Sequence, residues 1–135
     1  MKAILIDPSR CSVEAIDHSG KYEDTLSTLG CSMIEAVRLD GIKGDGSDFA
    51  YIDEEGMLVP AESQQYFALT VNEMTTIIAG PAIIFSSDDE GNNMATTLFV
   101  NDVIGSVFFI EQPTQDQIDR YLINTTRITF GDLGV

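Results

Sequence analysis

The sequence has few of the residues that build most catalytic and metal sites, with one histidine and two cysteines in 135 residues. A structural zinc site needs four ligands, usually cysteine and histidine, so a single chain lacks the ligand set. The motifs GxSxG, HExxH and CxxC are absent, and the glycine-rich residues 41–46 lack the GK[ST] ending of a phosphate-binding loop. We therefore predict no metal and no cofactor, and no catalytic residue is assigned.

His18 is preceded by Asp17 and followed by Ser19 and Gly20, which predicts an exposed position in a turn. A nucleophilic pair with Cys11 or Cys31 would require the fold to bring the two side chains together. We expect both cysteines to be free thiols, because the compartment inferred below is reducing.

Long apolar segments are also missing. No run approaches the roughly 18 apolar residues of a membrane-spanning helix, and no charged segment followed by an apolar stretch suggests export. We expect a cytoplasmic protein with no membrane partner.

Basic residues are scarce, since 7 Lys and Arg stand against 22 Asp and Glu and give a formal net charge of −15 at pH 7. Solubility is usually satisfied by a net charge of roughly 2–8 in magnitude. A field of this sign repels phosphates, which argues against direct binding of nucleic acid. It attracts basic partners, including the phosphate-binding grooves of nucleic-acid enzymes.

The length predicts a single domain over residues 1–135, and a hydrophobic fraction of 44% is sufficient for a core. We predict an α+β fold, a small mostly antiparallel sheet with two or three short helices packed on it. Its centre is the most apolar stretch, residues 77–85, read as one buried strand with a bend at Gly80-Pro81. The acidic turn 88–93 follows.

The remaining elements come from periodicity and turn residues. The expected strands are residues 2–7, 11–17, 32–39, 49–52, 57–59, 94–100 and 127–130. The hairpin of 49–52 and 57–59 would turn through Asp53 to Gly56, with Gly56 at positive φ. Helices are expected at 22–29, ending at Gly30, and at 113–122. A helix over 101–109 is weakened by Gly105, residues 61–76 fit either a helical turn or an irregular stretch, and 41–48 reads as an exposed loop.

Two runs of acids, Asp53 to Glu55 and Asp88 to Glu90, invite a calcium interpretation. The second run has Asn93 where a helix–loop–helix calcium site needs glycine and Phe99 where it needs a bidentate acid. Both runs are better explained as solvated turns. Carboxylate acid–base catalysis would need one buried member, and the local sequence gives no sign of burial.

Several segments, taken in order, carry a resemblance: residues 2–8 (KAILIDP), 37–39 (VRL), 51–56 (YIDEEG), 80–84 (GPAII) and 88–91 (DDEG). Over about residues 1–95 the chain resembles a small domain-of-unknown-function family of bacteria, plasmids and bacteriophages. The resemblance implies a small accessory protein of a phage or mobile element, located in the host-cell cytoplasm. It implies no activity and no site residues.

Three function hypotheses follow. The first is an interaction protein or DNA-mimic-type inhibitor that binds a basic groove on a host protein such as a nucleic-acid enzyme. The second is a small-ligand-binding domain or an enzyme that uses carboxylates or the hydroxyls of Tyr51 and Tyr66. The third is an acidic surface adapted to high salt, and a monomer or a homodimer fits all three. The contact residues expected for the first hypothesis are Asp45, Asp48, Asp53, Glu54, Glu55, Asp88, Asp89 and Glu90.

Overall fold

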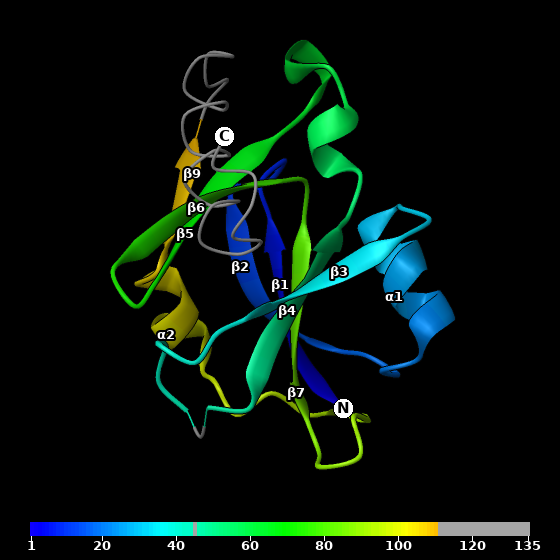
Figure 1. Cartoon of the computed structure of the whole chain (residues 1–135), viewed down its shortest axis with the longest axis vertical. Coiled ribbons are helices and arrows are strands. Elements are labelled where there is room, and N and C mark those ends of the chain that lie inside the picture. The colour runs from blue at the N-terminus through cyan, green and yellow to red at the C-terminus, as the bar shows by residue number, and fades with distance from the viewer. Residues whose placement is uncertain (45, 111–135) are drawn as a thin grey trace, which may run out of the picture.

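Two antiparallel β-sheets pack against each other in the computed structural model, which describes residues 1–44 and 46–110 (Figure 1). The elements are β1 (Lys2–Asp7), β2 (Ser12–Asp17), α1 (Tyr22–Leu29), β3 (Ile34–Arg38), β4 (Asp48–Asp53), the 3-10 turns η1 (Gly56–Leu58) and η2 (Ala61–Ser63), β5 (Tyr66–Val71), β6 (Met74–Ala79), β7 (Ala82–Ser87), β8 (Asn93–Met94), α2 (Val100–Ile104) and β9 (Val107–Ile110).

The larger sheet, sheet A, has the strand order β2-β1-β7-β4-β3, and the short β8 pairs with the end of β7. Strand β7 lies at its centre because its sequence, AIIFSS, supplies apolar side chains to both faces. The predicted hairpin at the N-terminus is confirmed, with Lys2 opposite Asp17 and Asp7 opposite Ser12. The smaller sheet, sheet B, has the order β6-β5-β9.

The main core lies between the two sheets. Alternate residues of β1, β4 and β7 point toward sheet B, including Ile4, Ala50 and Ile84, and they meet Phe67 and Ile78 from β5 and β6. All of these side chains are buried. At about 1.5–3 kcal/mol for each large apolar side chain removed from water, this layer is the chief stabilising element of the fold.

Residues 77–85 do not form one bent strand, and that prediction is wrong. The apolar run contains two strands that belong to different sheets, since β6 is an edge strand of sheet B and β7 is the centre of sheet A. Between them Gly80 adopts φ +86, a left-handed conformation that glycine adopts at little cost. Gly80 and Pro81 thus carry the chain from one sheet to the other.

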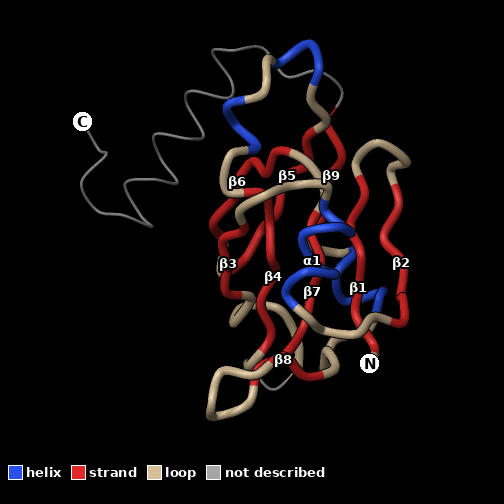
Figure 2. The backbone as a smooth tube through the Cα atoms, turned by 90° about the vertical axis from the view of Figure 1, so that its right-hand side faces the viewer, coloured by secondary structure: helices blue, strands red, loops and turns tan. Residues whose placement is uncertain are grey.

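Helix α1 packs on the outer face of sheet A and has the bounds predicted for it. Leu29 is buried against Ala3, Ile83 and Phe85, and Gly30 ends the helix with φ 67 and ψ 36. A helix is about 10 Å wide, whereas five strands spaced about 4.8 Å apart measure about 19 Å across. Figure 2 shows α1 in front of β7, with parts of β3 and β4 extending beyond it to one side.

Three further predictions are corrected by the structure. Residues 57–59 do not form a return strand, because the 3-10 turn η1 occupies Gly56–Leu58. The φ angle of Gly56 is also not positive. The partner strand expected at 94–100 is reduced to β8, whose Asn93 and Met94 pair with Ser87 and Ser86. Helix α2 ends at Ile104 and does not continue to Phe109, which lies in β9.

The predicted antiparallel pairing of the strands is confirmed, but the α+β fold with two or three helices on one sheet is matched only in part. The described strands form two sheets and dominate the structure, with few helices. Strand β3 lies within the predicted 32–39, and residues 61–76 contain η2, β5 and the start of β6. The helix expected at 113–122 and the strand at 127–130 lie outside the described residues. No helix in the described part of the chain is long and apolar enough to cross a membrane.

Candidate functional site

Six of the predicted acids lie in two groups at opposite ends of sheet A. The Asp53 cluster (Asp53, Glu54 and Glu55) stands at the end of β4, and the Asp88 cluster (Asp88, Asp89 and Glu90) forms the turn between β7 and β8. Because β4 begins opposite Ser86, two residues before Asp88, the two clusters are separated by at least the length of β4. Five steps of about 3.4 Å make this about 17 Å.

Asp48 was predicted to lie on the exposed loop, and the structure contradicts this. Its side chain alternates with Ala50 and Ile52 toward the core, and the residue is 3% exposed. The carboxylate accepts hydrogen bonds from Thr96 Oγ1 at 2.6 Å and from the Thr97 main-chain N–H at 2.9 Å, and Thr97 Oγ1 also donates to it. Asp48 therefore fastens residues 96–97 to β4, and Asp45 lies outside the described residues.

Asp88 shapes its own turn. Its carboxylate accepts bonds from the main-chain N–H of Asn92 at 2.8 Å, the Asn92 side-chain amide at 3.1 Å and the N–H of Glu90 at 2.9 Å. These hydrogen bonds, those from Asn92 having the largest effect, hold the pKa of Asp88 below its usual value. Asp89 and Glu90 are exposed beside it, so they are the members of the cluster that are free to meet a partner.

A hollow of about 390 Å³ lies on the part of sheet A that α1 leaves uncovered. Its floor is aromatic, with the rings of Phe49 and Tyr51 edge to face at 4.7 Å and Tyr51 against Phe85 at 6.1 Å. We call it the aromatic hollow. It is lined by Ala36, Arg38, Asp40, Gly46, Ser47, Asp48, Phe49, Tyr51, Ser87, Asp88 and Gly91.

The polar groups of the aromatic hollow already bond to neighbours. The Tyr51 hydroxyl donates to Asn93 Oδ1 at 3.0 Å, and Arg38 pairs with Asp40 at 3.2 Å. Burial raises the pKa of Tyr51, so the phenol stays protonated at neutral pH. Such a surface offers apolar contact beside polar groups that are already paired.

Glu35 stands on β3 between the two clusters, on the opposite face of sheet A from the aromatic hollow. Its carboxylate is half-buried, and this burial, followed by repulsion from Glu54, raises its pKa above the usual value of 4.5. The folded chain therefore holds the Glu35 proton more tightly than the unfolded chain does. The stability that this difference contributes is fully present below the pKa that Glu35 has in the unfolded chain. It is lost as pH rises through the pKa that Glu35 has in the folded chain.

Replacing Glu35 with glutamine removes this penalty. We expect Glu35→Gln to unfold at the same urea concentration as the natural chain below about pH 4 and to be more stable at pH 7. The gain is less than about 1 kcal/mol, because the site is partly screened by solvent. Urea denaturation between pH 3.5 and 8 measures it, with the exposed Glu23→Gln as control. A difference that is constant across this range would contradict the assignment.

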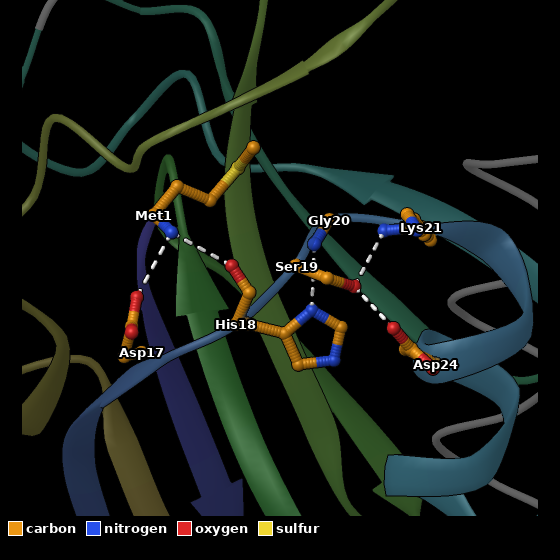
Figure 3. Close-up of polar contacts among 7 residues, drawn as sticks. All are labelled: Met1, Asp17, His18, Ser19, Gly20, Lys21 and Asp24. Atoms are coloured by element: carbon orange, nitrogen blue, oxygen red, sulfur yellow. Dashed lines mark hydrogen bonds and ion pairs between the residues drawn. The ribbon is translucent and has the colours of Figure 1, made fainter.

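His18 is buried, against the prediction of an exposed turn position. Figure 3 shows its ring between the turn and α1, with Nδ1 accepting the N–H of Gly20 at 2.9 Å. The Nε2 atom lies 3.1 Å from Thr28 Oγ1, whose hydroxyl already donates to the Asp24 carbonyl. The proton is therefore assigned to Nε2. The ring packs edge-on against Phe85 at 5.3 Å, so His18 closes the core beneath α1.

Neither cysteine joins His18 in a nucleophilic pair. Both are free thiols; Cys11 Sγ donates to the Pro8 carbonyl at 3.7 Å. Burial, and then the charge of Asp53, raises the pKa of Cys31, which disfavours its thiolate. Within residues 1–44 and 46–110, no three His, Cys, Asp or Glu side chains are placed to hold a metal ion.

Neither the aromatic hollow nor the half-buried position of Glu35 was predicted from the sequence. The alternation of Phe49 and Tyr51 along β4 places both rings on one face, which a strand period of two predicts. The short α1 then determines that this face is left partly open. These two signals together would have indicated the hollow, but only if the order of the strands in sheet A had been known.

Comparisons with known proteins give one match. No curated protein and no solved structure matches the chain. A family model described as a domain of unknown function, DUF3846, matches residues 1–108. This span includes both acidic clusters, the aromatic hollow and Glu35, and it extends beyond the 95 residues over which the resemblance was seen. The chain is a member of the DUF3846 family of domains of unknown function.

Proposed function

We propose that this protein is an interaction protein that binds a basic surface on a partner protein, such as the DNA-binding groove of a nucleic-acid enzyme. The observation that carries the proposal is the state of the two acidic clusters. Within the described residues, no ion pair involves any of their six carboxyl groups. Their charge is thus available to a partner.

Within the described residues, no lysine or arginine forms an ion pair with these clusters. Arg10 pairs with Glu14 and Arg38 with Asp40, while Lys2 donates to the Leu98 carbonyl and lies over the Phe99 ring. The unpaired carboxylates repel one another and attract an oppositely charged surface. Such a field speeds association and makes binding depend on salt.

The separation of the clusters limits the kind of partner. A single bound cation cannot span about 17 Å, so a partner that neutralises both clusters presents basic groups at two places. A groove that binds duplex DNA does so, because its Lys and Arg side chains contact phosphates at several positions along the duplex. This supports the DNA-mimic form of the proposal.

The test uses the full-length protein on a solid support and the heparin-binding fraction of a bacterial lysate. Retention is measured at low salt, at about 0.5 M salt, where the screening length is only a few Å, and with competing duplex DNA. Two double variants remove two charges each, Glu54→Gln with Glu55→Gln and Asp89→Asn with Glu90→Gln. Asp53 and Asp88 are left unchanged, because their carboxylates accept main-chain N–H groups of their own turns.

The matched control is Glu23→Gln with Glu73→Gln, two exposed acids outside both clusters. We expect a basic protein to be retained stoichiometrically at low salt and displaced by DNA, with each cluster variant weakening retention about 3-fold to 10-fold. The control should bind as the natural chain does. An equal loss in the control, or retention that DNA does not displace, would overturn the proposal.

A further inference from the structure

Strand β3 (Ile34–Arg38) is an edge strand that carries one acid, Glu35, and has further acids on the segments beside its two ends. In the described part of the chain it pairs with β4 alone. Glu54 N–H donates to the Met33 carbonyl and Leu39 N–H to the Asp48 carbonyl. Because main-chain groups of an antiparallel strand alternate in direction, odd-numbered residues face β4. The N–H and C=O groups of Ile34, Ala36 and Arg38 therefore face the open edge.

The same three residues direct their side chains to the face of α1. Ala36 and Arg38 line the aromatic hollow, and Ile34 packs in the cluster beneath α1. A strand added to this edge would set alternate side chains beside the hollow and over its aromatic floor. Its remaining side chains would lie on the opposite face, next to Glu35.

Acidic groups flank the edge at both ends and in the middle. At one end Asp53 is paired with Ile34 and Glu54 bonds to Met33. At the other end Asp40 and Asp88 line the hollow beside Arg38. Glu35 lies between these two ends. An extended chain bound on this edge would therefore lie near carboxylates at both of its ends and at its middle.

We propose that the edge of β3 binds an extended basic segment of the partner protein, which adds to sheet A as a further strand. The inference rests on the proposed function and names its mode of recognition. Main-chain hydrogen bonds to Ile34, Ala36 and Arg38 supply affinity, as in other cases of strand addition. Lysine or arginine side chains opposite Glu35 and beside the two acidic clusters supply selectivity.

A second copy of this chain fits the edge poorly. Self-pairing would bring together two chains that each carry a net charge of −15, with a half-buried Glu35 from each copy on the same face of the joined strands. Like charges on neighbouring strands destabilise pairing. Inward-pointing charge is a recognised device against edge-to-edge self-association, and a basic partner turns the same charge into an attraction.

The probe is a nine-residue peptide, Thr-Lys-Val-Lys-Val-Lys-Val-Lys-Thr, titrated into the full-length protein by calorimetry at low salt. The comparison peptide has the same sequence with N-methyl groups on alternate residues, which keeps the charge and removes main-chain donors. We expect the unmodified peptide to bind at least 10-fold more tightly. Hydrogen exchange at the N–H groups of Ile34, Ala36 and Arg38 should slow when it binds.

The protein variant is Ala36→Pro, which removes one N–H that faces the open edge and leaves the bonds to β4 in place. Its matched control is Ala15→Pro on β2, an exposed alanine on the other edge of sheet A. Its N–H also faces outward, since His18 N–H donates to the Met1 carbonyl and even-numbered residues of β2 face β1. Ala36→Pro should weaken peptide binding at least 10-fold and Ala15→Pro should not.

The outcomes distinguish strand addition at β3 from the proposed function on which it rests, the binding of a basic partner protein. Equal binding of the N-methylated and unmodified peptides to the natural chain overturns strand addition, and this readout needs no folded variant. If the lysate protein is still retained and displaced by DNA, charge-based binding stands without it. If neither peptide binds and no basic protein is retained, the proposed function fails as well.

Discussion

Replacing Asp48 with alanine is expected to lower the free energy of unfolding by about 3 kcal/mol, the largest effect of any single acid in the described chain. The carboxylate is buried and accepts from the Thr96 hydroxyl and the Thr97 N–H. Removing it leaves these donors without their acceptor, and the Thr96 hydroxyl among them is buried. Urea denaturation at pH 7 measures the loss.

Two further variants show whether the acceptor atoms cause this loss. Asp48→Asn keeps the shape and one acceptor oxygen, so it should lose roughly half as much. Asp89→Ala removes an acid of the same type from an exposed turn and should change stability by no more than about 0.5 kcal/mol. If Asp48→Ala and Asp89→Ala cost the same, the hydrogen-bond network around Asp48 does not stabilise the fold.

Gly56→Ala is expected to destabilise the protein by about 2 kcal/mol. A Cβ atom at this position would lie 2.6 Å from the Ala79 carbonyl oxygen and 3.2 Å from the Ala79 Cβ. Both are at the rigid end of β6, and the Gly56 carbonyl is itself fixed by the Gln64 side-chain amide at 2.8 Å. The turn η1 would have to move away from sheet B.

The control for Gly56 is Gly105→Ala. There a Cβ meets nothing nearer than 3.7 Å, and φ is −66, which alanine adopts readily. Its midpoint in urea should stay within about 0.5 kcal/mol of the natural chain. Equal stability of the Gly56 and Gly105 variants would show that η1 yields without cost and that the close approach to Ala79 is unimportant.

Local sequence signals predicted the elements that local interactions define. The hairpin of β1 and β2, helix α1 with its glycine end, and β3 follow from periodicity and turn residues within each segment. The exposure of Glu54, Glu55, Asp89 and Glu90 also follows from their place in acidic turns.

The errors come from partners distant in the sequence. The apolar run that contains Gly80-Pro81 has the same sequence pattern whether its two halves lie in one sheet or in two. The pattern therefore does not distinguish one bent strand from two strands. Asp48 looked exposed because it ends a glycine-rich loop, and its partners Thr96 and Thr97 come 48 and 49 residues later. Gly56 suggested a turn with positive φ. In the structure, its lack of a side chain allows the main chain of η1 to approach Ala79 closely.

The site was predictable only in its charge. Composition indicated an acidic surface, but the division into two clusters depends on β4 running from one to the other. The open edge of β3 depends on the strand order, which pairing between distant segments determines. No pattern within residues 34–38 distinguishes an edge strand from a central one.

The passage of the chain through Gly80 and Pro81 has a consequence for how the protein comes apart. The final strand residue before this link belongs to sheet B and the first after it to the centre of sheet A. Because only Gly80 and Pro81 separate β6 from β7, sheet B cannot move away from sheet A while sheet A keeps its structure. Moving sheet B displaces the central strand of sheet A, and moving sheet A displaces the edge strand β6 of sheet B, so the two sheets behave as one cooperative unit in unfolding.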